Sequence, residues 1–200
     1  PHSGMDHRIR NVCLNLLHIC FLLISFPSNI IPHFPKIARR RSCQTQFSRK
    51  NTETCFRQVS PDEVIRKMVR TAEPARPQNV QINMNLNCWD QRLVANEIQF
   101  SQLILNLILN SFHAMEPQGG ILTISTSFDD KNIQIQVTDT GCGISRENQT
   151  KIFEPFFTTK ETGKGTGLGL AIVAQVVEDH RGSIRVESWE EKGTTFLVKL

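Results

Sequence analysis

Residues 139–143 of the chain read Asp-Thr-Gly-Cys-Gly, and residues 165–170 read Gly-Thr-Gly-Leu-Gly-Leu. In the first stretch, a carboxylate is followed by two glycines, which let the backbone approach a planar ring where a Cβ would clash. In the second, three glycines lead into an apolar run over residues 168–177. This pattern predicts a loop with free N–H groups that opens into the N-terminus of a helix.

Together the two stretches indicate a purine nucleotide site. Asp139 can accept a hydrogen bond from the exocyclic amine of adenine, and Gly141 and Gly143 let the turn bend close to the base. Backbone N–H groups of the glycine loop and the positive end of the following helix suit phosphate oxygens. Each motif alone also occurs in ordinary turns, so the argument depends on their order and spacing.

Two further segments belong to the same series. An apolar segment with two asparagines covers residues 102–110, ahead of both glycine motifs. Residues 153–160, between the two motifs, read Phe-Glu-Pro-Phe-Phe-Thr-Thr-Lys, an aromatic clip followed by a cation. The clip and the glycine loop after it are typical of a lid over a nucleotide.

In order and residue type these segments resemble the catalytic domain of two-component sensor histidine kinases, within the gyrase, chaperone and histidine-kinase ATPase superfamily. The resemblance covers residues 60–200, and residues 154–160 and 193–196 look most like the nitrogen-sensor branch. The segments that resemble the N, G1, F and G2 boxes of the family are 102–110, 139–143, 153–157 and 165–170. The F box is the most specific of these segments, because gyrases, mismatch-repair ATPases and heat-shock chaperones lack it.

The resemblance implies ATP and Mg²⁺ as the ligands. Asn110 would offer its side-chain oxygen to Mg²⁺, and Asn106 lies one helical turn earlier on the same face. Each basic candidate, such as His113, has the alternative of a solvated surface position, and Thr194 or Thr195 would complete the adenine pocket through water. The residues expected to contact the nucleotide are Asn106, Asn110, His113, Asp139, Gly141, Gly143, Ile144, Phe153, Lys160, Lys164, Gly165, Thr166, Gly167, Leu168, Gly169, Leu170, Thr194 and Thr195.

The periodicity of residues 60–200 predicts an α+β fold, a two-layer α/β sandwich with helices on one face of a mixed sheet. Ser60-Pro61-Asp62-Glu63 has the pattern of a capping box with proline at the first helical position, so a helix should begin at residue 61. Further helices are expected over residues 97–115 and 168–177. Alternating apolar and polar residues predict strands over 80–86, 121–128, 133–139, 183–189 and 194–200.

Residues 1–59 have a different composition. They hold nine of the 23 Lys and Arg residues and two of the 19 acidic residues, so the net charge of +4 comes from this segment. The triplet Arg39-Arg40-Arg41 lacks interleaved aromatics, so we expect a solvated turn and no nucleic-acid partner. The apolar run 14–26 is too short to span a bilayer, which favours a buried helix over a membrane span or a signal peptide.

By the resemblance, residues 1–59 would be a dimerising and phosphoacceptor segment, here degenerate or truncated. The family carries its phosphorylated histidine in a motif resembling His-Glu-Ile-Arg-Asn-Pro-Leu, and residues 7–13 read His-Arg-Ile-Arg-Asn-Val-Cys. His7 is therefore a candidate phosphoacceptor. Arg8 replaces the acidic residue that would polarise the imidazole, and prolines at 27, 32 and 35 would break the first helix.

The expected function is the core of an ATP-dependent sensor histidine kinase, which transfers the γ-phosphate to a histidine and on to the receiver domain of a response regulator. We expect a homodimer through the N-terminal segment. The alternative is a nucleotide-binding module of a degenerate kinase without autokinase activity; the F box argues against a chaperone-like or mismatch-repair-like ATPase. The cysteines show no CxxC pair and no zinc-site spacing, which predicts reduced thiols and a cytoplasmic location. The stimulus and the identity of the response regulator are not encoded in these residues.

Overall fold

The computed structural model describes residues 56–200 except 117, 130 and 161–164. His7 and Lys164 therefore lie outside the described residues, as does the N-terminal segment up to residue 55. None of the described helices combines the length and the hydropathy that crossing a bilayer requires.

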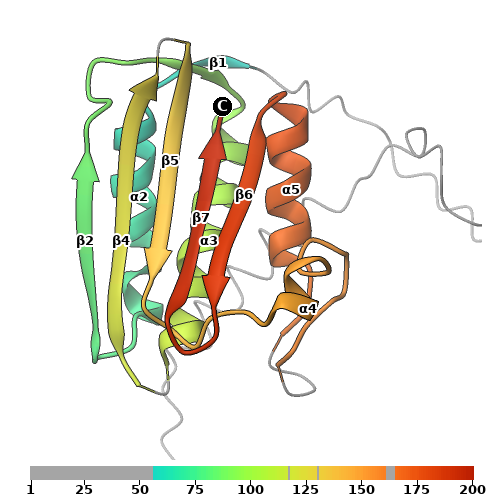
Figure 1. Cartoon of the computed structure of the whole chain (residues 1–200). Coiled ribbons are helices and arrows are strands. Elements are labelled where there is room, and N and C mark those ends of the chain that lie inside the picture. The colour runs from blue at the N-terminus through green and yellow to red at the C-terminus, as the bar shows by residue number, and fades with distance from the viewer. Residues whose placement is uncertain (1–55, 117, 130, 161–164) are drawn as a thin grey trace, which may run out of the picture. The chain divides into compact units, whose positions relative to one another are not determined.

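A mixed sheet of five strands forms one layer of the domain, in the order β2-β4-β5-β7-β6 (Figure 1). The strands are β2 (Val80–Leu86), β4 (Gly120–Asp129), β5 (Asn132–Asp139), β6 (Ser183–Trp189) and β7 (Gly193–Lys199). β2 and β4 pair in parallel, and the other three pairs are antiparallel. The parallel pair needs a crossover connection, which contains the longest described helix, α3 (Glu97–Met115).

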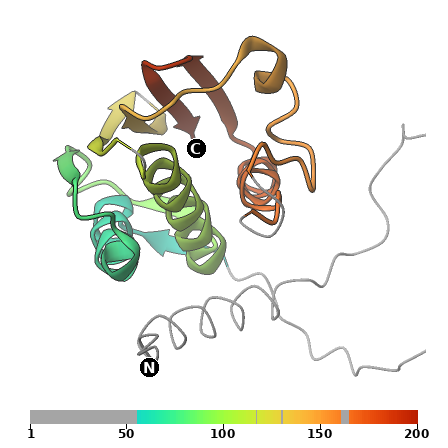
Figure 2. The same cartoon turned by 90° about the horizontal axis from the view of Figure 1, so that it is seen from below.

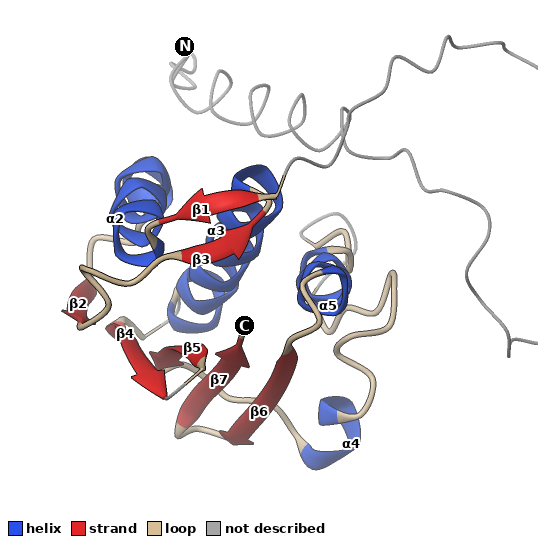
Figure 3. Ribbon diagram, turned by 90° about the horizontal axis from the view of Figure 1, so that it is seen from above, coloured by secondary structure: helices blue, strands red, loops and turns tan. Residues whose placement is uncertain are grey.

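Three helices form the second layer and cover one face of the sheet (Figures 2 and 3). They are α2 (Pro61–Ala72), α3 and α5 (Gly169–Asp179); a 3₁₀ turn, η1 (Glu73–Ala75), follows α2, and a short helix, α4 (Arg146–Gln149), follows β5. The core lies between the layers, where Phe100, Leu103 and Leu107 of α3 are buried together with Ile135 and Val137 of β5. The predicted α+β sandwich is confirmed, with all five predicted strands and the three predicted helices.

A second, two-stranded sheet was not predicted. It pairs β1 (Arg57–Val59) antiparallel with β3 (Leu93–Ala95). Strands of three residues are too short for an alternating pattern to stand out from the sequence. β1 lies just ahead of residue 60, where we expected the ATPase-like region to begin, and its pairing with β3 ties it to that region.

The start of α2 at Pro61 is confirmed, but the predicted capping bond is wrong. Ser60 is the N-cap residue, and its side chain makes no cap hydrogen bond. Asp62 is fully buried instead of solvated, and accepts from the backbone N–H of Cys88 at 3.0 Å and from Thr126 Oγ1 at 2.8 Å. The first turn of α2 is thus held through Asp62 to the loop after β2 and to β4, which a local capping rule cannot foresee.

Candidate functional site

Asp139, the last residue of β5, is 3% exposed and is surrounded by hydrogen-bond donors. Its Oδ1 accepts from the N–H groups of Gly141 at 3.0 Å and Thr194 at 3.3 Å, and its Oδ2 accepts from the Ser111 hydroxyl at 3.1 Å. Burial raises the pKa of Asp139, and these three hydrogen bonds oppose the shift. The carboxylate is held in one orientation, and Oδ2 keeps acceptor capacity for a further donor.

The two glycines after Asp139 are required by close contacts between backbone segments. A Cβ on Gly141 would lie 2.6 Å from the carbonyl oxygen of Ala114 on α3. Gly143 has φ +71°, and a Cβ there would lie 2.0 Å from the carbonyl oxygen of Trp189. The backbone of the predicted turn therefore packs closely against the end of α3 on one side and against the β6–β7 hairpin on the other.

A hydrogen-bonded cluster connects this turn to the sheet. The Ile144 N–H donates to Ser188 Oγ at 2.8 Å, and Ser188 Oγ lies 2.9 Å from Thr194 Oγ1. The side-chain amide of Gln149, on α4, donates to the carbonyls of Ile144 at 2.8 Å and Ser188 at 2.9 Å. Sequence reasoning missed Ser111, Gln149 and Ser188, because single polar residues outside any motif give no signal of what they contact.

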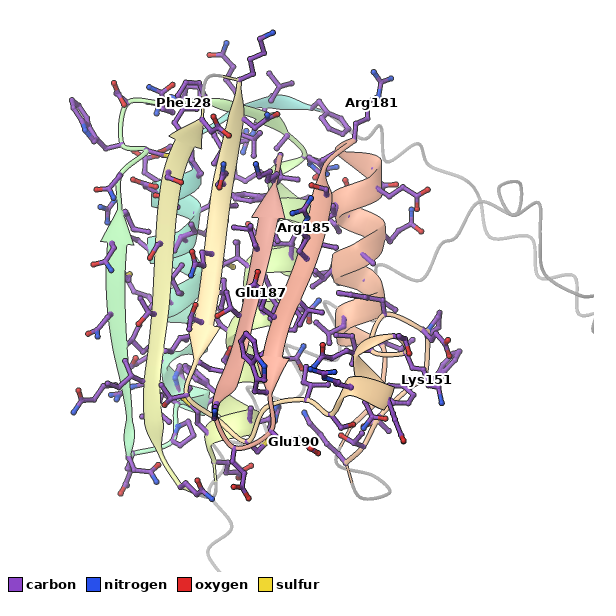
Figure 4. The ribbon with its side chains drawn as sticks, in the orientation of Figure 1. Phe128, Lys151, Arg181, Arg185, Glu187 and Glu190 are labelled. Carbon is purple, nitrogen blue, oxygen red and sulfur yellow. The ribbon has the colours of Figure 1, made fainter. Side chains whose placement is uncertain are left out.

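Of the two threonine candidates, the structure brings one to Asp139. Thr194 is 4% exposed on the helix-covered side of β7, where its N–H meets the Asp139 carboxylate. Thr195 points to the opposite side, with its Oγ1 3.0 Å from Thr138 Oγ1, and it is the register partner of Glu187. Glu187 lies on the sheet face that none of the described helices covers (Figure 4), so Thr195 is separated from Asp139 by the sheet.

The asparagine helix and the glycine loop meet at the N-terminus of α5. A Cβ added to Gly169, the first residue of α5, would lie 3.6 Å from Asn110 Nδ2 and 3.7 Å from Asn106 Oδ1. The Nδ2 atoms of both asparagines are buried and have no hydrogen-bond partner among the described residues. Buried polar atoms without partners cost free energy, so two of them beside a helix N-terminus indicate a place that a polar ligand completes.

These asparagines fit a nucleotide with Mg²⁺. Within the described residues there is no group of three or more His, Cys, Asp or Glu side chains that would hold a metal alone. Mg²⁺ in nucleotide sites takes few protein oxygens and fills its shell with phosphate oxygens and water. A side-chain amide turned by 180° exchanges its N and O without a change of shape, so Asn106 and Asn110 can present oxygen to a cation or N–H to a phosphate.

The aromatic clip and the glycine loop are in direct backbone contact. The Phe156 N–H donates to the carbonyl of Gly167 at 2.9 Å, and a Cβ on Gly167, whose φ is +66°, would lie 2.4 Å from the Phe156 carbonyl carbon. Phe153 packs against the hydrophobic core, whereas Phe156 is 74% exposed. These contacts hold the backbone of the clip directly against that of the glycine loop.

The glycine-loop residues just before Gly169 lead into α5. Gly165 approaches Thr158, since a Cβ on it would lie 2.7 Å from Thr158 Oγ1. Thr166 Oγ1 accepts from the N–H of Leu168 at 3.4 Å, a long hydrogen bond that begins the turn into α5. Leu170 is half-buried and packs against the core.

Two basic side chains lie near the C-terminal end of α3. His113 is exposed, yet partial desolvation of its ring lowers its pKa, and the nearby charge of Lys160 lowers it further. Burial also lowers the pKa of Lys160, which Glu116 and Cys142 oppose. The protonated form of each side chain is thus less favoured than it would be in water. A bound anion would stabilise both protonated forms.

The comparison with known families agrees with this geometry. The family model described as histidine kinase-, DNA gyrase B-, and HSP90-like ATPase matches residues 95–200. The chain belongs to this ATPase family. The match begins at β3 and includes all four boxes identified from the sequence, so the predicted relationship is confirmed.

Individual relatives of this ATPase domain are sensor and sporulation kinases. The sensor histidine kinase ZraS of Salmonella typhi is 36% identical over 139 residues, which is 70% of this chain and 30% of ZraS. Sporulation kinase C of Bacillus subtilis is 39% identical over 123 residues, 61% of this chain and 28% of that kinase. The chain thus spans less than a third of the length of these relatives.

Solved structures show the same fold. The catalytic domain of histidine kinase ThkA has a TM-score of 0.63 and 31% identity, over 72% of this chain and 94% of that one. The mycobacterial sensor histidine kinase MprB has a TM-score of 0.64 and 27% identity, over 72% of this chain and 96% of that one. Residues of the described part therefore have the fold of a histidine kinase catalytic domain.

Proposed function

We propose that this chain is the ATP-binding core of a sensor histidine kinase, and that it binds ATP with Mg²⁺ between α3, the turn after β5 and the N-terminus of α5. One observation carries the proposal: both ends of the site meet on α3. Ser111 of this helix contacts the buried Asp139 carboxylate, and the buried Nδ2 atoms of Asn106 and Asn110, also on α3, have no hydrogen-bond partner among the described residues. Asp139 suits the base, and Asn106 and Asn110 suit the phosphate end. Nucleotide use follows from the ATPase family, while the metal is inferred from the asparagines.

Each end of the site has a distinct task. Oδ2 of Asp139 would accept from the adenine amine, while the fixed donors around it keep the carboxylate in place. The free N–H groups at the start of α5 and the side chains of His113 and Lys160 would face phosphate oxygens. Bound Mg²⁺, held by the Asn110 oxygen, would offset the charge that develops as the γ-phosphoryl leaves.

The protein's part in phosphoryl transfer is positioning and charge stabilisation. We propose that the acceptor is a histidine of this chain or of a partner subunit, with His7 the candidate, and that an aspartate of a response regulator takes the phosphoryl group next. Dimerisation through residues 1–59, a cytoplasmic location and membership of the nitrogen-sensor branch remain predictions.

The experiment follows the labelled γ-phosphate. The full chain is incubated with labelled ATP and Mg²⁺, and the product is tested for an acid-labile, base-stable phosphoramidate. We expect His7→Gln to abolish the label and His33→Gln, a histidine change in the same segment, to leave it. Calorimetry with ATP and Mg²⁺ is run on the same samples.

A second function has its own support. Arg8 puts a cation where the family has an acidic residue, which would disable the neighbouring imidazole. Binding of ATP without any phosphoramidate would establish the nucleotide-binding module instead of the kinase. Absence of ATP binding by folded protein would refute both functions.

A further inference from the structure

Ser111 is the one polar residue among the buried residues of α3. The others are Phe100, Leu103, Ile104, Leu107, Ile108, Phe112 and Met115. Ser111 is 1% exposed, and an alanine at this position would favour the helix and avoid burying a hydroxyl. Helix formation and apolar packing therefore do not explain why a serine is here.

Its hydroxyl has one described role, the hydrogen bond to Asp139. Ser111 Oγ donates to Asp139 Oδ2 at 3.1 Å, whereas the two backbone donors, Gly141 and Thr194, both bind Oδ1. Ser111 is thus the side-chain donor to this carboxylate among the described residues, and it binds Oδ2, the oxygen that neither backbone donor occupies.

We propose that Ser111 is a specificity-determining residue for the base: by donating to Oδ2 it holds Asp139 as a pure acceptor, which selects a 6-amino purine over a 6-oxo purine. This rests on the proposed function, in which Asp139 meets the base. Ser111 acts through Asp139 and is therefore a positioning residue.

The selectivity follows from donor and acceptor chemistry. An ionised carboxylate only accepts, so it suits the amine of adenine and repels the 6-oxo group of hypoxanthine, which is also an acceptor. A protonated carboxyl group can donate to that oxo group. Ser111 favours the ionised form by hydrogen bonding to it, against the burial that favours the protonated form.

Other titratable groups border the same site, namely His113 on α3, Glu116 just after α3, Cys142 in the turn and Lys160 in the loop. None of the ion pairs within the described residues includes Asp139. ATP and ITP carry the same triphosphate and differ at the 6 position of the base. Protonation of groups that face the phosphates therefore cancels in the ratio of the two dissociation constants.

The experiment measures that ratio across a pH series. Dissociation constants of ATP and ITP, each with Mg²⁺, are measured by calorimetry for the wild type, Ser111→Ala, Ser111→Cys and Thr138→Val. Thr138→Val is the control, because it removes a hydroxyl next to Asp139 in sequence but on the opposite side of the sheet. Ser111→Cys keeps a weak donor of similar shape and serves in place of Ser111→Ala if that variant does not fold.

We expect wild type and Thr138→Val to prefer ATP with a ratio that is constant near neutral pH. Loss of one hydrogen bond to a charged group should lower the preference of Ser111→Ala about tenfold. As the pH falls and Asp139 becomes protonated, the preference for ATP over ITP should decline. In Ser111→Ala this decline should begin at a higher pH than in the wild type, and in Ser111→Cys at a pH between the two.

Curves for the Ser111 variants that coincide with that of the wild type would overturn the inference while leaving the proposed function intact. A uniform loss of ATP and ITP affinity, with an unchanged ratio, would likewise overturn it, because it would show a structural role only. Failure of the wild type to bind ATP would instead refute the proposed function itself.

Discussion

Asp139→Asn isolates the contact that we assign to the base. The asparagine oxygen can take the place of Oδ1 and keep the hydrogen bonds from Gly141 and Thr194. Its NH₂ group then faces Ser111, whose hydroxyl can rotate and accept. The same NH₂ group meets the adenine amine as donor against donor, so the variant should lose a hydrogen bond to a charged group, which contributes about 1.5–3 kcal/mol.

This loss corresponds to an ATP dissociation constant roughly 10 to 150 times higher than that of the wild type, at about 1.4 kcal/mol per factor of ten. ITP should be affected in the opposite direction, because its 6-oxo group can accept from the new amide. Asp129→Asn is the matched control: Asp129 is an exposed residue at the end of β4, whose described partners are Gln134 and Lys199.

The stability of Asp139→Asn provides the check on folding. The folded-state pKa of Asp139 is raised above its ordinary value of 3.8, so the stability it contributes is present below that pH and lost as the pH rises through the folded pKa. At neutral pH the wild type therefore holds a buried charge, which costs stability. We expect the free energy of unfolding of the variant, measured in urea, to lie within about 1 kcal/mol of that of the wild type. Unchanged ATP affinity in a folded variant would refute our assignment of the base site.

Four other substitutions test the rest of the site. Gly143→Ala must adopt φ +71° and overlap a carbonyl oxygen, so urea unfolding should show a loss of about 2–5 kcal/mol, and a loss under about 1 kcal/mol would contradict the close contact. Gly169→Ala places its Cβ at an ordinary contact distance of 3.6 Å, so thermal stability should be kept while calorimetry shows weaker ATP binding, because the methyl fills the phosphate end. Asn110→Ala should make ATP affinity insensitive to Mg²⁺; affinity that still rises with Mg²⁺ as in the wild type would disprove the metal assignment. The folded-state pKa of His113 is lowered from 6.5, so the stability that it contributes is present above pH 6.5 and is lost as the pH falls through the folded-state pKa. His113→Gln should therefore reduce the loss of unfolding free energy on the acid side, measured by urea unfolding across a pH series.

Local patterns were sufficient for the five strands of the main sheet, for its three covering helices and for the family. The alternation over residues 80–86 and 133–139 predicted β2 and β5, and the helical period over residues 97–115 predicted α3. These patterns are readable because side-chain direction repeats every two residues in a strand and every 3.6 in a helix. The order of the four boxes, over residues 102–170, was equally visible, and the family relationship that it predicts is confirmed by the family match.

Partners across the fold could not be predicted in this way. Thr194 and Thr195 are equivalent in the sequence, and the register of β7 against β5 decides that Thr194 lies beside Asp139. In the sequence, Asp62 stands in the first turn of a predicted helix, where acidic residues are usually exposed. Packing of α2 against the sheet buries it instead, beside Thr126.

The sequence by itself therefore determined the five strands of the main sheet, the three long helices, the fold class and the type of ligand, because these depend on local steric preferences and on motifs a few residues long. The tertiary structure decided which atoms share the site: the Ser111 hydroxyl on Asp139, and the amides of Asn106 and Asn110 beside Gly169. Such contacts join segments that are distant in the chain, so they depend on strand register and helix packing, which no short stretch of sequence contains.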